Sequence, residues 1–247
     1  MLPEKAFIVD TETTGLDFHT DQVVELARLE LPDTPAEFLK MPLDGDNLPM
    51  FHELYGHTKP MALGAVVTTL INPEKLVGLP LFKAVDYVGR YIIGHNVEFD
   101  ARMTNCVGAR QIDTMYLSRR LWPELDSHTQ GAVLVHIALL TGRGYAWALD
   151  LIRGAHRADC DVLNCARILK YIIWTIDKEH PVKGKLTWED LHRITDDSRV
   201  PTIMSFGKFK GQPVTAVEAG WAEWYAGTDN TDPYVIIALK RAGVLPA

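Results

Sequence analysis

Cysteine is scarce in this chain of 247 residues. The three cysteines are Cys106, Cys160 and Cys165. The number is odd and no pair has C-x-x-C spacing, so the sequence indicates neither a disulfide framework nor a zinc site. We expect buried, reduced thiols of the kind found in a cytoplasmic protein.

Long apolar runs are also missing. No stretch approaches the roughly 20 residues that cross a bilayer. The first ten residues, MLPEKAFIVD, carry the acid Glu4 and have no long apolar stretch before Asp10, which is not typical of a secretory signal. The sequence therefore predicts a cytoplasmic protein without membrane contact.

An excess of positive charge is the third absence. The chain has 25 Lys and Arg against 32 Asp and Glu, a formal net charge of −7. This argues against a broad surface for non-specific DNA binding. It leaves nucleic acid open as a substrate, because an enzyme that releases its product needs only a local basic rim. Active-site carboxylates that hold metal ions are also less negative than the formal charge suggests.

The order of predicted elements indicates an α/β fold. Buried or alternating apolar runs predict strands at 6–10, 22–31, 51–55, 91–94 and 109–115. Helical periodicity predicts helices at 73–90, 128–141, 144–153 and 158–178, and another that is capped by Asn96 and carries Asp100. Residues 32–50 hold four prolines, and we expect an irregular excursion or an extended hairpin there. Strands first, then strands alternating with helices, predict a mixed sheet flanked by helices.

A small C-terminal module follows the predicted helix 158–178. We expect a domain over 1–179, a linker over 180–201 with one helix at 187–194, and a compact module over 202–247. In the module we expect helices around 217–226 and 232–242. In its segment FGKFKG, strand alternation would place Lys208 and Lys210 on one face and the phenylalanines near the other. Such a face suits contact with backbone phosphates, and a hairpin that only packs is the alternative.

Acidic residues recur in four short fragments that are weak signals one by one. VDTETTG holds Asp10 and Glu12, IIGHNVEFDARM holds His95, Asn96 and Asp100, QIDTM holds Asp113, and HRADCD holds His156 and Asp161. One acidic pair ends a buried strand, one Asp follows another buried strand, and one lies at the inner edge of the most amphipathic helix. If the strands are adjacent, four carboxylates converge.

Four converging carboxylates need counter-charge. They cannot all ionise close together without it. Oxygen ligands select Mg²⁺ or Mn²⁺, and two such ions clamp the attacking and leaving oxygens of a phosphodiester displacement. His156 could take the proton from the attacking water, because an imidazole titrates near neutral pH.

The segments DTETTG, HNxxFD and HxxxxD, in this order and at about this spacing, resemble the three motifs of the DEDDh 3′→5′ exonuclease family. The resemblance covers about residues 5–178 and implies an RNase H-like fold with two Mg²⁺ (or Mn²⁺) ions. It also implies that Asp10, Glu12, Asp100 and Asp161 are metal ligands, that His156 is the general base, and that Asp113 has a supporting role.

Three further segments resemble the exodeoxyribonuclease X branch of the family. DTMYLSRRLWP, HRADCDV and the tail FGKFKG…WAEWYA carry that likeness. It implies hydrolysis at DNA 3′ ends, single-stranded or duplex. The chain departs from the family pattern at Thr68 and Thr69, where a histidine is expected.

Four further residues are predicted to contact substrate: Thr13, Leu16, Phe99 and Asn96. Leu16 would wedge between terminal bases, or fold back onto the core. Phe99 would stack on a base, or pack in the core. Two other functions stay open: a proofreading or RNA-trimming exonuclease of the same family, and a catalytically inactive nucleic-acid-binding protein. The sequence does not indicate an oligomeric state.

Overall fold

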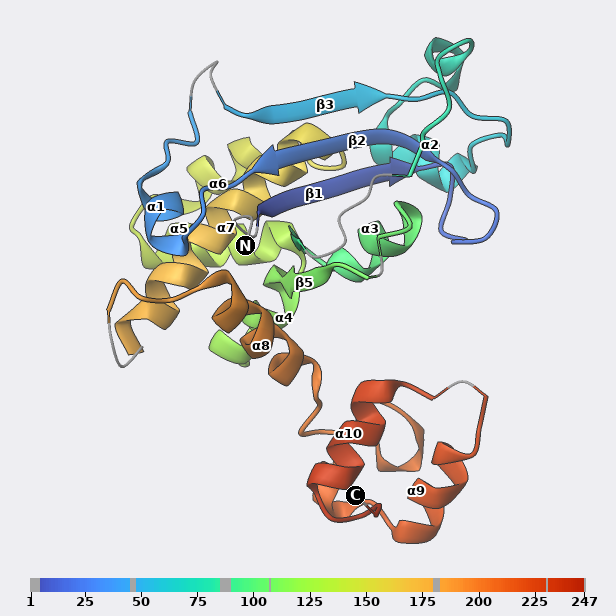
Figure 1. The fold of residues 1–247 in the computed structure, drawn as a ribbon, viewed down its shortest axis with the longest axis vertical. Coiled ribbons are helices and arrows are strands. Elements are labelled where there is room, and N and C mark those ends of the chain that lie inside the picture. Colours follow the sequence, from blue (N-terminus) through green and yellow to red (C-terminus); the bar gives the residue numbers. More distant parts are fainter. Residues whose placement is uncertain are drawn as a thin grey trace. The chain divides into compact units, whose positions relative to one another are not determined.

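One mixed sheet forms the centre of the protein. The structure is a computed structural model that describes residues 5–44, 48–84, 90–106, 108–179, 183–229 and 231–246. Over these residues the strands β1 (Ala6–Thr13), β2 (Val23–Glu30), β3 (Met50–Leu54), β4 (Tyr91–Gly94) and β5 (Arg110–Asp113) are ordered β3-β2-β1-β4-β5 (Figure 1). The pairs β1–β2 and β2–β3 are antiparallel, whereas β1–β4 and β4–β5 are parallel. The predicted mixed sheet is confirmed.

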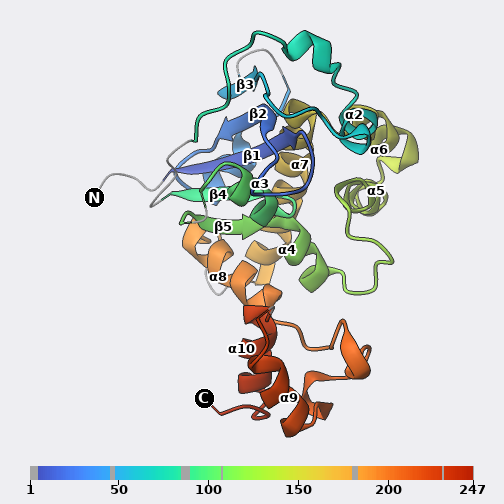
Figure 2. The same ribbon diagram turned by 90° about the vertical axis from the view of Figure 1, so that its right-hand side faces the viewer.

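Helices cover both faces of this sheet (Figure 2). Ala6 and Ile8 of β1 pack into the main core with the long helix α7 (Ala158–Glu179), because alternate strand residues point to one face. The residues between them, Phe7 and Val9, pack with the helix α3 (Val97–Met103) on the other face. The expected α/β sheet flanked by helices is therefore present.

Among the helices that contact α7 are α4 (Thr114–Leu121), α5 (Gln130–Leu140) and α6 (Gly144–Ile152). The helices predicted at 128–141 and 144–153 correspond to α5 and α6, and α4 was not predicted. No helix among the described residues is both long and apolar enough to cross a membrane.

Strand β4 ends before its neighbour β1. Their pairing stops at Ile8 opposite Ile93, so the last residues of β1 have no neighbouring strand on that side. Helix α3 begins there, after Asn96 in a left-handed conformation with φ of 70°. The side chain of Asn96 makes no capping hydrogen bond. The carboxylate of Asp113 caps α3 in its place, accepting hydrogen bonds from the backbone N–H of Asn96 and of Val97 at 3.0 and 3.1 Å.

Of two predictions between β2 and β4, the irregular connection over 32–50 is incomplete and the helix over 73–90 is wrong. Residues 32–50 contain the helix α1 (Pro35–Lys40), which the prolines concealed although Pro35 suits a first helical position. In place of a helix over 73–90 there is a short 3₁₀ helix, Pro73–Leu76, and residues 77–84 are not helical. Gly78 adopts φ of 83° and Pro80 follows, which together end the helical pattern. Residues 85–89 of that prediction, and 45–47 of the predicted excursion, lie outside the described residues.

Two helices were missed or misjudged in extent. Helix α2 (Leu63–Thr69) was not predicted. Helix α8 (Trp188–Arg199) is longer than the helix predicted at 187–194 within the linker. Trp188 and Leu191 are buried in the main core, and the buried Thr195 accepts a hydrogen bond through Oγ1 from the backbone N–H of Asp113 at 3.3 Å.

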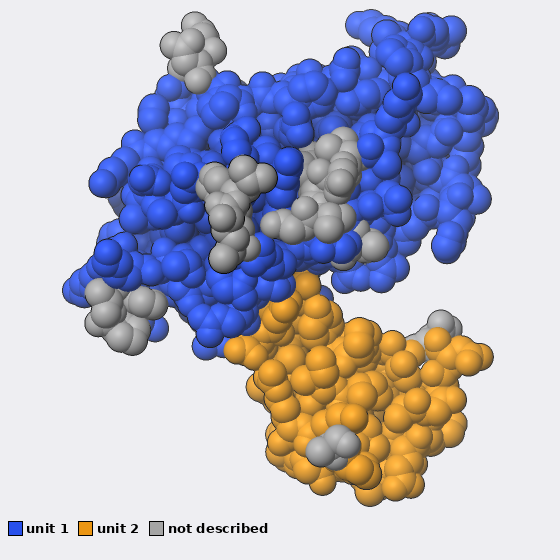
Figure 3. All heavy atoms as spheres, in the orientation of Figure 1, with its two compact units in different colours: residues 1–195 blue, residues 196–247 orange. Residues whose placement is uncertain are grey.

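The chain divides into two compact units, residues 1–195 and 196–247 (Figure 3). The second has its own apolar core, which includes Met204, Phe209, Tyr225 and Leu239. It contains the helices α9 (Ala219–Ala226) and α10 (Pro233–Arg241), as predicted.

The alternating strand predicted for FGKFKG is wrong. Residues Gly207–Phe209 form a 3₁₀ turn with Gly207 at φ of 66°. Phe209 is buried, and Lys208 pairs with Glu218 at 2.7 Å.

Candidate active site

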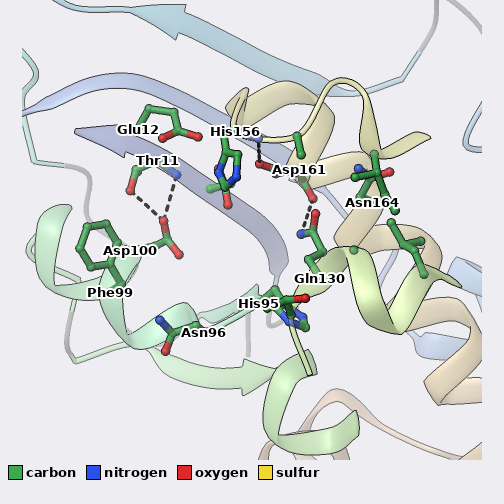
Figure 4. Close-up of a pocket in the computed structure, with 16 residues that line it drawn as sticks. Thr11, Glu12, His95, Asn96, Phe99, Asp100, Gln130, His156, Asp161 and Asn164 are labelled. Carbon is green, nitrogen blue, oxygen red and sulfur yellow. Dashed lines mark hydrogen bonds between the residues drawn. The ribbon is translucent and has the colours of Figure 1, made fainter. Parts of the chain in front are cut away.

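The five residues predicted to carry the chemistry line one cavity of about 490 Å³ (Figure 4). Asp10 and Glu12 come from the open end of β1, where period-two spacing places both on one face. Asp100 comes from α3, Asp161 from the first turn of α7, and His156 from the loop just before α7.

Asp100 is held in place by β1. The backbone N–H of Thr11 and its hydroxyl both donate to Oδ1 of Asp100, at 2.9 and 2.7 Å. That N–H is free to do so because β4 has already ended. The missing strand neighbour therefore allows a carboxylate from α3 to reach the edge of β1.

His156 and Asp161 are fixed to each other through the backbone. His156 adopts the left-handed φ of 64°, and its N–H donates to Oδ2 of Asp161 at 2.7 Å. The imidazole ring lies between the side chains of Glu12 and Asp161 (Figure 4). One ligand atom from each of these three residues lies within 4.8 Å of the others. His156 is exposed, so its ring is open to the cavity and to solvent.

All four carboxyl groups have raised pKa values. Burial raises the pKa of Glu12 to about 8, with Asp161 and Glu25 adding to the effect. Burial also raises the pKa of Asp100 to about 7 and of Asp161 to about 6, although hydrogen bonds from Thr11 and from His156 oppose these shifts. The pKa of Asp10 lies well above its usual range because of burial first and then the charges of Asp100, Asp161 and Glu12.

The site fits divalent cations. The carboxylates repel one another, and no lysine or arginine is among the described residues that line the cavity. Hard oxygen donors in this number suit Mg²⁺ or Mn²⁺, which would supply the missing positive charge. The group formed by Glu12, His156 and Asp161 can hold a metal ion.

An ion pair that the sequence analysis missed holds the His156 loop. Glu25 on β2 is fully buried opposite Glu12 and accepts hydrogen bonds from Nε and Nη2 of Arg157 at 3.0 and 2.9 Å. It also bonds to Nε2 of His52 at 2.6 Å. The available signal was an acid in the middle of an apolar strand, which is costly unless it is paired.

Two further polar residues support the cavity. Gln130, which was not predicted, donates from Nε2 to the backbone carbonyl of Asp161 at 3.1 Å. His95 bonds through Nδ1 to Thr114 and through Nε2 to the carbonyl of His128, at 2.9 and 2.7 Å. Both ring nitrogens of His95 are therefore engaged in joining β4 to α4 and to the loop before α5.

The residues predicted to contact substrate fall in two places. Asn96 lines the catalytic cavity, whereas Thr13 and Leu16 line an adjacent hollow of about 820 Å³. Phe99 lines both, as do Glu12 and His156, so the two hollows adjoin. Leu16 is 80% exposed and is not folded onto the core. The hydroxyl of Thr13 is buried and donates to the carbonyl of Gly15 at 2.5 Å, so it shapes the loop that presents Leu16.

Comparisons with known proteins agree with this geometry. The chain matches no family model. It is 26% identical over 241 residues to exodeoxyribonuclease 10 of Escherichia coli K12, covering 95% of this chain and 96% of that protein. It is 29% identical over 189 residues to a PolC-type DNA polymerase III of Latilactobacillus sakei, covering 70% of this chain but 11% of the polymerase.

One solved structure shows the same fold. Exonuclease X in complex with 5′ overhanging duplex DNA superposes with a TM-score of 0.52 at 21% identity. The match covers 77% of this chain and 99% of that one. The chain thus has homologues among exonucleases in sequence and a neighbour among them in fold.

Proposed function

We propose that the chain, which is similar to exodeoxyribonuclease 10 along 95% of its length, is a 3′→5′ exonuclease of the DEDDh type that removes nucleotides from DNA 3′ ends by metal-dependent hydrolysis. The observation that carries the proposal is the convergence of Asp10, Glu12, Asp100, Asp161 and His156 on one cavity. Their raised pKa values show four acids that are poorly compensated by the protein alone.

We propose that the four carboxylates hold two Mg²⁺ or Mn²⁺ ions. When bound, such ions neutralise the carboxylates and stabilise the charge that develops on the attacking and leaving oxygens of a phosphodiester. The protein's part is to fix the ligands before substrate arrives. Thr11 orients the carboxylate of Asp100, and the backbone of His156 orients that of Asp161.

His156 is the proposed general base. Its ring is exposed at the cavity beside Glu12 and Asp161, where a water that attacks the terminal phosphorus would lie. A neutral imidazole at this place accepts the proton of that water, and the nearby carboxylates stabilise the imidazolium that results. The left-handed backbone at His156 and the Glu25–Arg157 ion pair hold the ring there.

The terminal nucleotide would lie across the two adjoining hollows. Phe99 lines both and is placed to contact a base, while Asn96 lines the catalytic side. The exposed Leu16 borders the other side, where it would insert beside the terminal base pair of a duplex.

DNA is favoured over RNA because the relatives are an exodeoxyribonuclease and DNA polymerases, and the extent of each match favours a stand-alone exonuclease over a proofreading one. The match to exodeoxyribonuclease 10 covers 95% of this chain, whereas the matches to PolC-type polymerases cover 70% or less. We assign the exonuclease to a domain over 1–179 and propose that the C-terminal module over 202–247 assists DNA binding. The residues of the 180–201 segment include α8, which continues the core of the first unit. A cytoplasmic location stays a prediction.

The direct test is a time course on a 5′-labelled DNA strand with Mg²⁺, beside the matching RNA strand. We expect a ladder that shortens from the 3′ end of DNA, and its loss with EDTA. Asp10→Ala and His156→Ala should each lower the rate by several powers of ten, on the order of 10³-fold or more, because the residues act as one unit. Glu124→Ala, an exposed acid outside the cavity, is the matched control and should cleave normally.

The two other functions are distinct outcomes of the same assay. Preferential shortening of RNA would retain the site and change the substrate to that of an RNA-trimming enzyme. Cleavage of neither strand, together with tight DNA binding and no heat of Mg²⁺ or Mn²⁺ binding, would identify a catalytically inactive nucleic-acid-binding protein.

A further inference from the structure

A separate cavity of about 440 Å³ lies among α5, α6, α7 and the segment that follows α1. Its volume is within the usual range for small-molecule sites. Beside aliphatic side chains, its lining includes three cations and three aromatic rings: Arg143, Arg167, Lys170, Trp147, Tyr171 and Trp174. This composition is unusual in a chain whose net charge is −7. We propose that the cavity binds a nucleotide, with the base against the aromatic rings and the phosphate on the cations.

The cations are concentrated and poorly neutralised. Among the described residues lining the cavity, Asp44 is the one acid beside Arg143, Arg167 and Lys170. Lys170 donates to the backbone carbonyls of Leu39, at 3.1 Å, and of Met41. Carbonyl oxygens satisfy its hydrogens without cancelling its charge.

Arg167 has a similar environment. Its Nη1 donates to Oδ1 of Asn164 at 3.2 Å, again a neutral acceptor. Burial lowers the pKa of Arg167 and of Lys170, so both charges have lost part of their hydration. Holding two partly desolvated cations beside one acid is unfavourable unless an anion joins them. A phosphate satisfies that requirement, because guanidinium groups match phosphate oxygens in a two-point geometry.

The aromatic rings supply the second half of a nucleotide site. The guanidinium of Arg143 lies 4.6 Å from the centroid of Trp147. Tyr171 and Trp174 lie side by side, with centroids 5.2 Å apart at an angle of 41°. Trp174 is 45% exposed, and Nζ of Lys178 lies over its ring, 3.0 Å from the centroid, so a base would contact the part of the ring that stays exposed. Stacking on such rings is tolerant of base identity, whereas a bare phosphate or sulfate would leave the rings unused.

The cavity is distinct from the catalytic one, although the two share a wall. Leu134 lines both, and Asn164, which accepts the hydrogen bond from Arg167, lines the catalytic cavity. The proposed ligand contacts none of the four acids. Its binding therefore does not depend on the proposed nuclease function, and each proposal can fail alone.

The experiment is equilibrium dialysis of the full-length protein against dAMP in EDTA, which removes the metal ions that would attract a phosphate to the other cavity. We expect saturable binding. Deoxyadenosine, which lacks the phosphate, and inorganic phosphate, which lacks the base, should each bind about tenfold more weakly or worse. Arg167→Gln and the exposed Arg143→Gln should each weaken dAMP binding by a similar factor. Arg153→Gln, an exposed arginine of the same region outside the cavity, should leave it unchanged.

The outcomes are decisive in each direction. Absence of dAMP binding, or binding that Arg143→Gln and Arg167→Gln leave intact, overturns the proposal; Arg143→Gln settles the case if Arg167→Gln fails to fold. A short single strand that displaces dAMP at tenfold lower concentration would identify the nucleotide as part of a DNA strand. Displacement no better than by dAMP itself would identify a free mononucleotide, the product of the proposed reaction.

Discussion

At the scale of single residues, the acids of the proposed catalytic cavity must be ionised to hold metal ions, but their ionisation destabilises the metal-free fold. Glu12, Asp100 and Asp161 have pKa values of about 8, 7 and 6 in the folded chain without metal. In the unfolded chain such groups titrate near pH 4. The folded state therefore keeps these protons to higher pH, and their removal weakens the metal-free fold.

This gives a pH dependence with a definite sign. In EDTA, the melting temperature should fall as the pH rises from about 4 to about 8, because the unfolded state ionises more readily across that window. Mg²⁺ should restore the melting temperature most strongly at pH 8, where its ligands are deprotonated. Asp10→Asn should flatten the decline in EDTA. A melting temperature that stays level or rises across this window without metal would contradict the assignment.

Leu16 allows a second residue-scale test. Because its side chain is 80% exposed, Leu16→Ala should leave the melting temperature unchanged. We expect cleavage of a blunt duplex to slow by about tenfold, as for the loss of one to two kcal/mol of contact, with single strands cleaved at nearly the normal rate. Parallel rate measurements on the two substrates decide the point. Equal losses on both would exclude a wedge.

At the scale of elements, one short strand creates the site. Because β4 stops at Gly94, the end of β1 has an open edge that α3 fills with Asp100. Asp113, at the end of β5, caps α3 and thereby sets the direction of the helix that carries Asp100. The supporting role predicted for Asp113 thus has a structural basis that is consistent with the prediction.

The ion pair between β2 and the His156 loop supports an element-scale prediction. Glu25→Gln keeps the shape of the side chain but removes a buried charge that accepts from Arg157 and His52. We expect a loss of about 1.5–3 kcal/mol in the free energy of unfolding, as for hydrogen bonds to charged groups. Loosening the loop should lower kcat while KM changes little. Urea unfolding and steady-state kinetics measure the two effects.

A conservative variant separates positioning from general stability. Arg157→Lys retains the charge and should recover part of the kcat lost in Arg157→Ala. Asp190→Asn is the control: Asp190 lies on α8, bonds to Thr187 and does not line the cavity, so the variant should not change kcat at temperatures where it is folded. If Glu25→Gln altered stability alone, the positioning role would be wrong.

At the scale of the whole molecule, the chain is two units with separate cores. Truncation after Val200 leaves α8 complete and should leave the first unit folded, since Trp188 and Leu191 are part of its core. The shortened protein should still cleave single strands but bind DNA more weakly. Circular dichroism and DNA titrations at two salt concentrations test this.

Point variants in the second unit refine the test. Lys210 is exposed, whereas Lys208 is paired with Glu218. Lys210→Gln should weaken DNA binding and lower the slope of log K against log salt by about 1, as for one lost phosphate contact. Lys208→Gln should have a smaller effect. Unchanged binding after truncation would remove DNA contact from the roles of this unit.

The sequence by itself predicted the proposed site residues and determined most of the elements. Short motifs that resemble those of the DEDDh family predicted Asp10, Glu12, Asp100, Asp161 and His156, and the fold brings these five residues to one cavity. The sheet and α7 were clear from periodicity, because burial repeats strictly along a strand or a long helix. Helix 73–90 failed because Gly78 and Pro80 outweigh an apolar pattern that is only approximate.

Only the tertiary structure decided which groups support that chemistry. Thr11, Glu25, Gln130 and Arg157 lie far apart in the chain, and their hydrogen bonds exist because β4 ends early and α7 packs across the sheet. The same holds for the cavity of about 440 Å³ proposed to bind a nucleotide, whose residues come from α5, α6, α7 and the segment after α1. Local sequence patterns predict which residues are candidates for the chemistry. The contacts that orient these residues depend on which distant segments of the chain become neighbours in the fold.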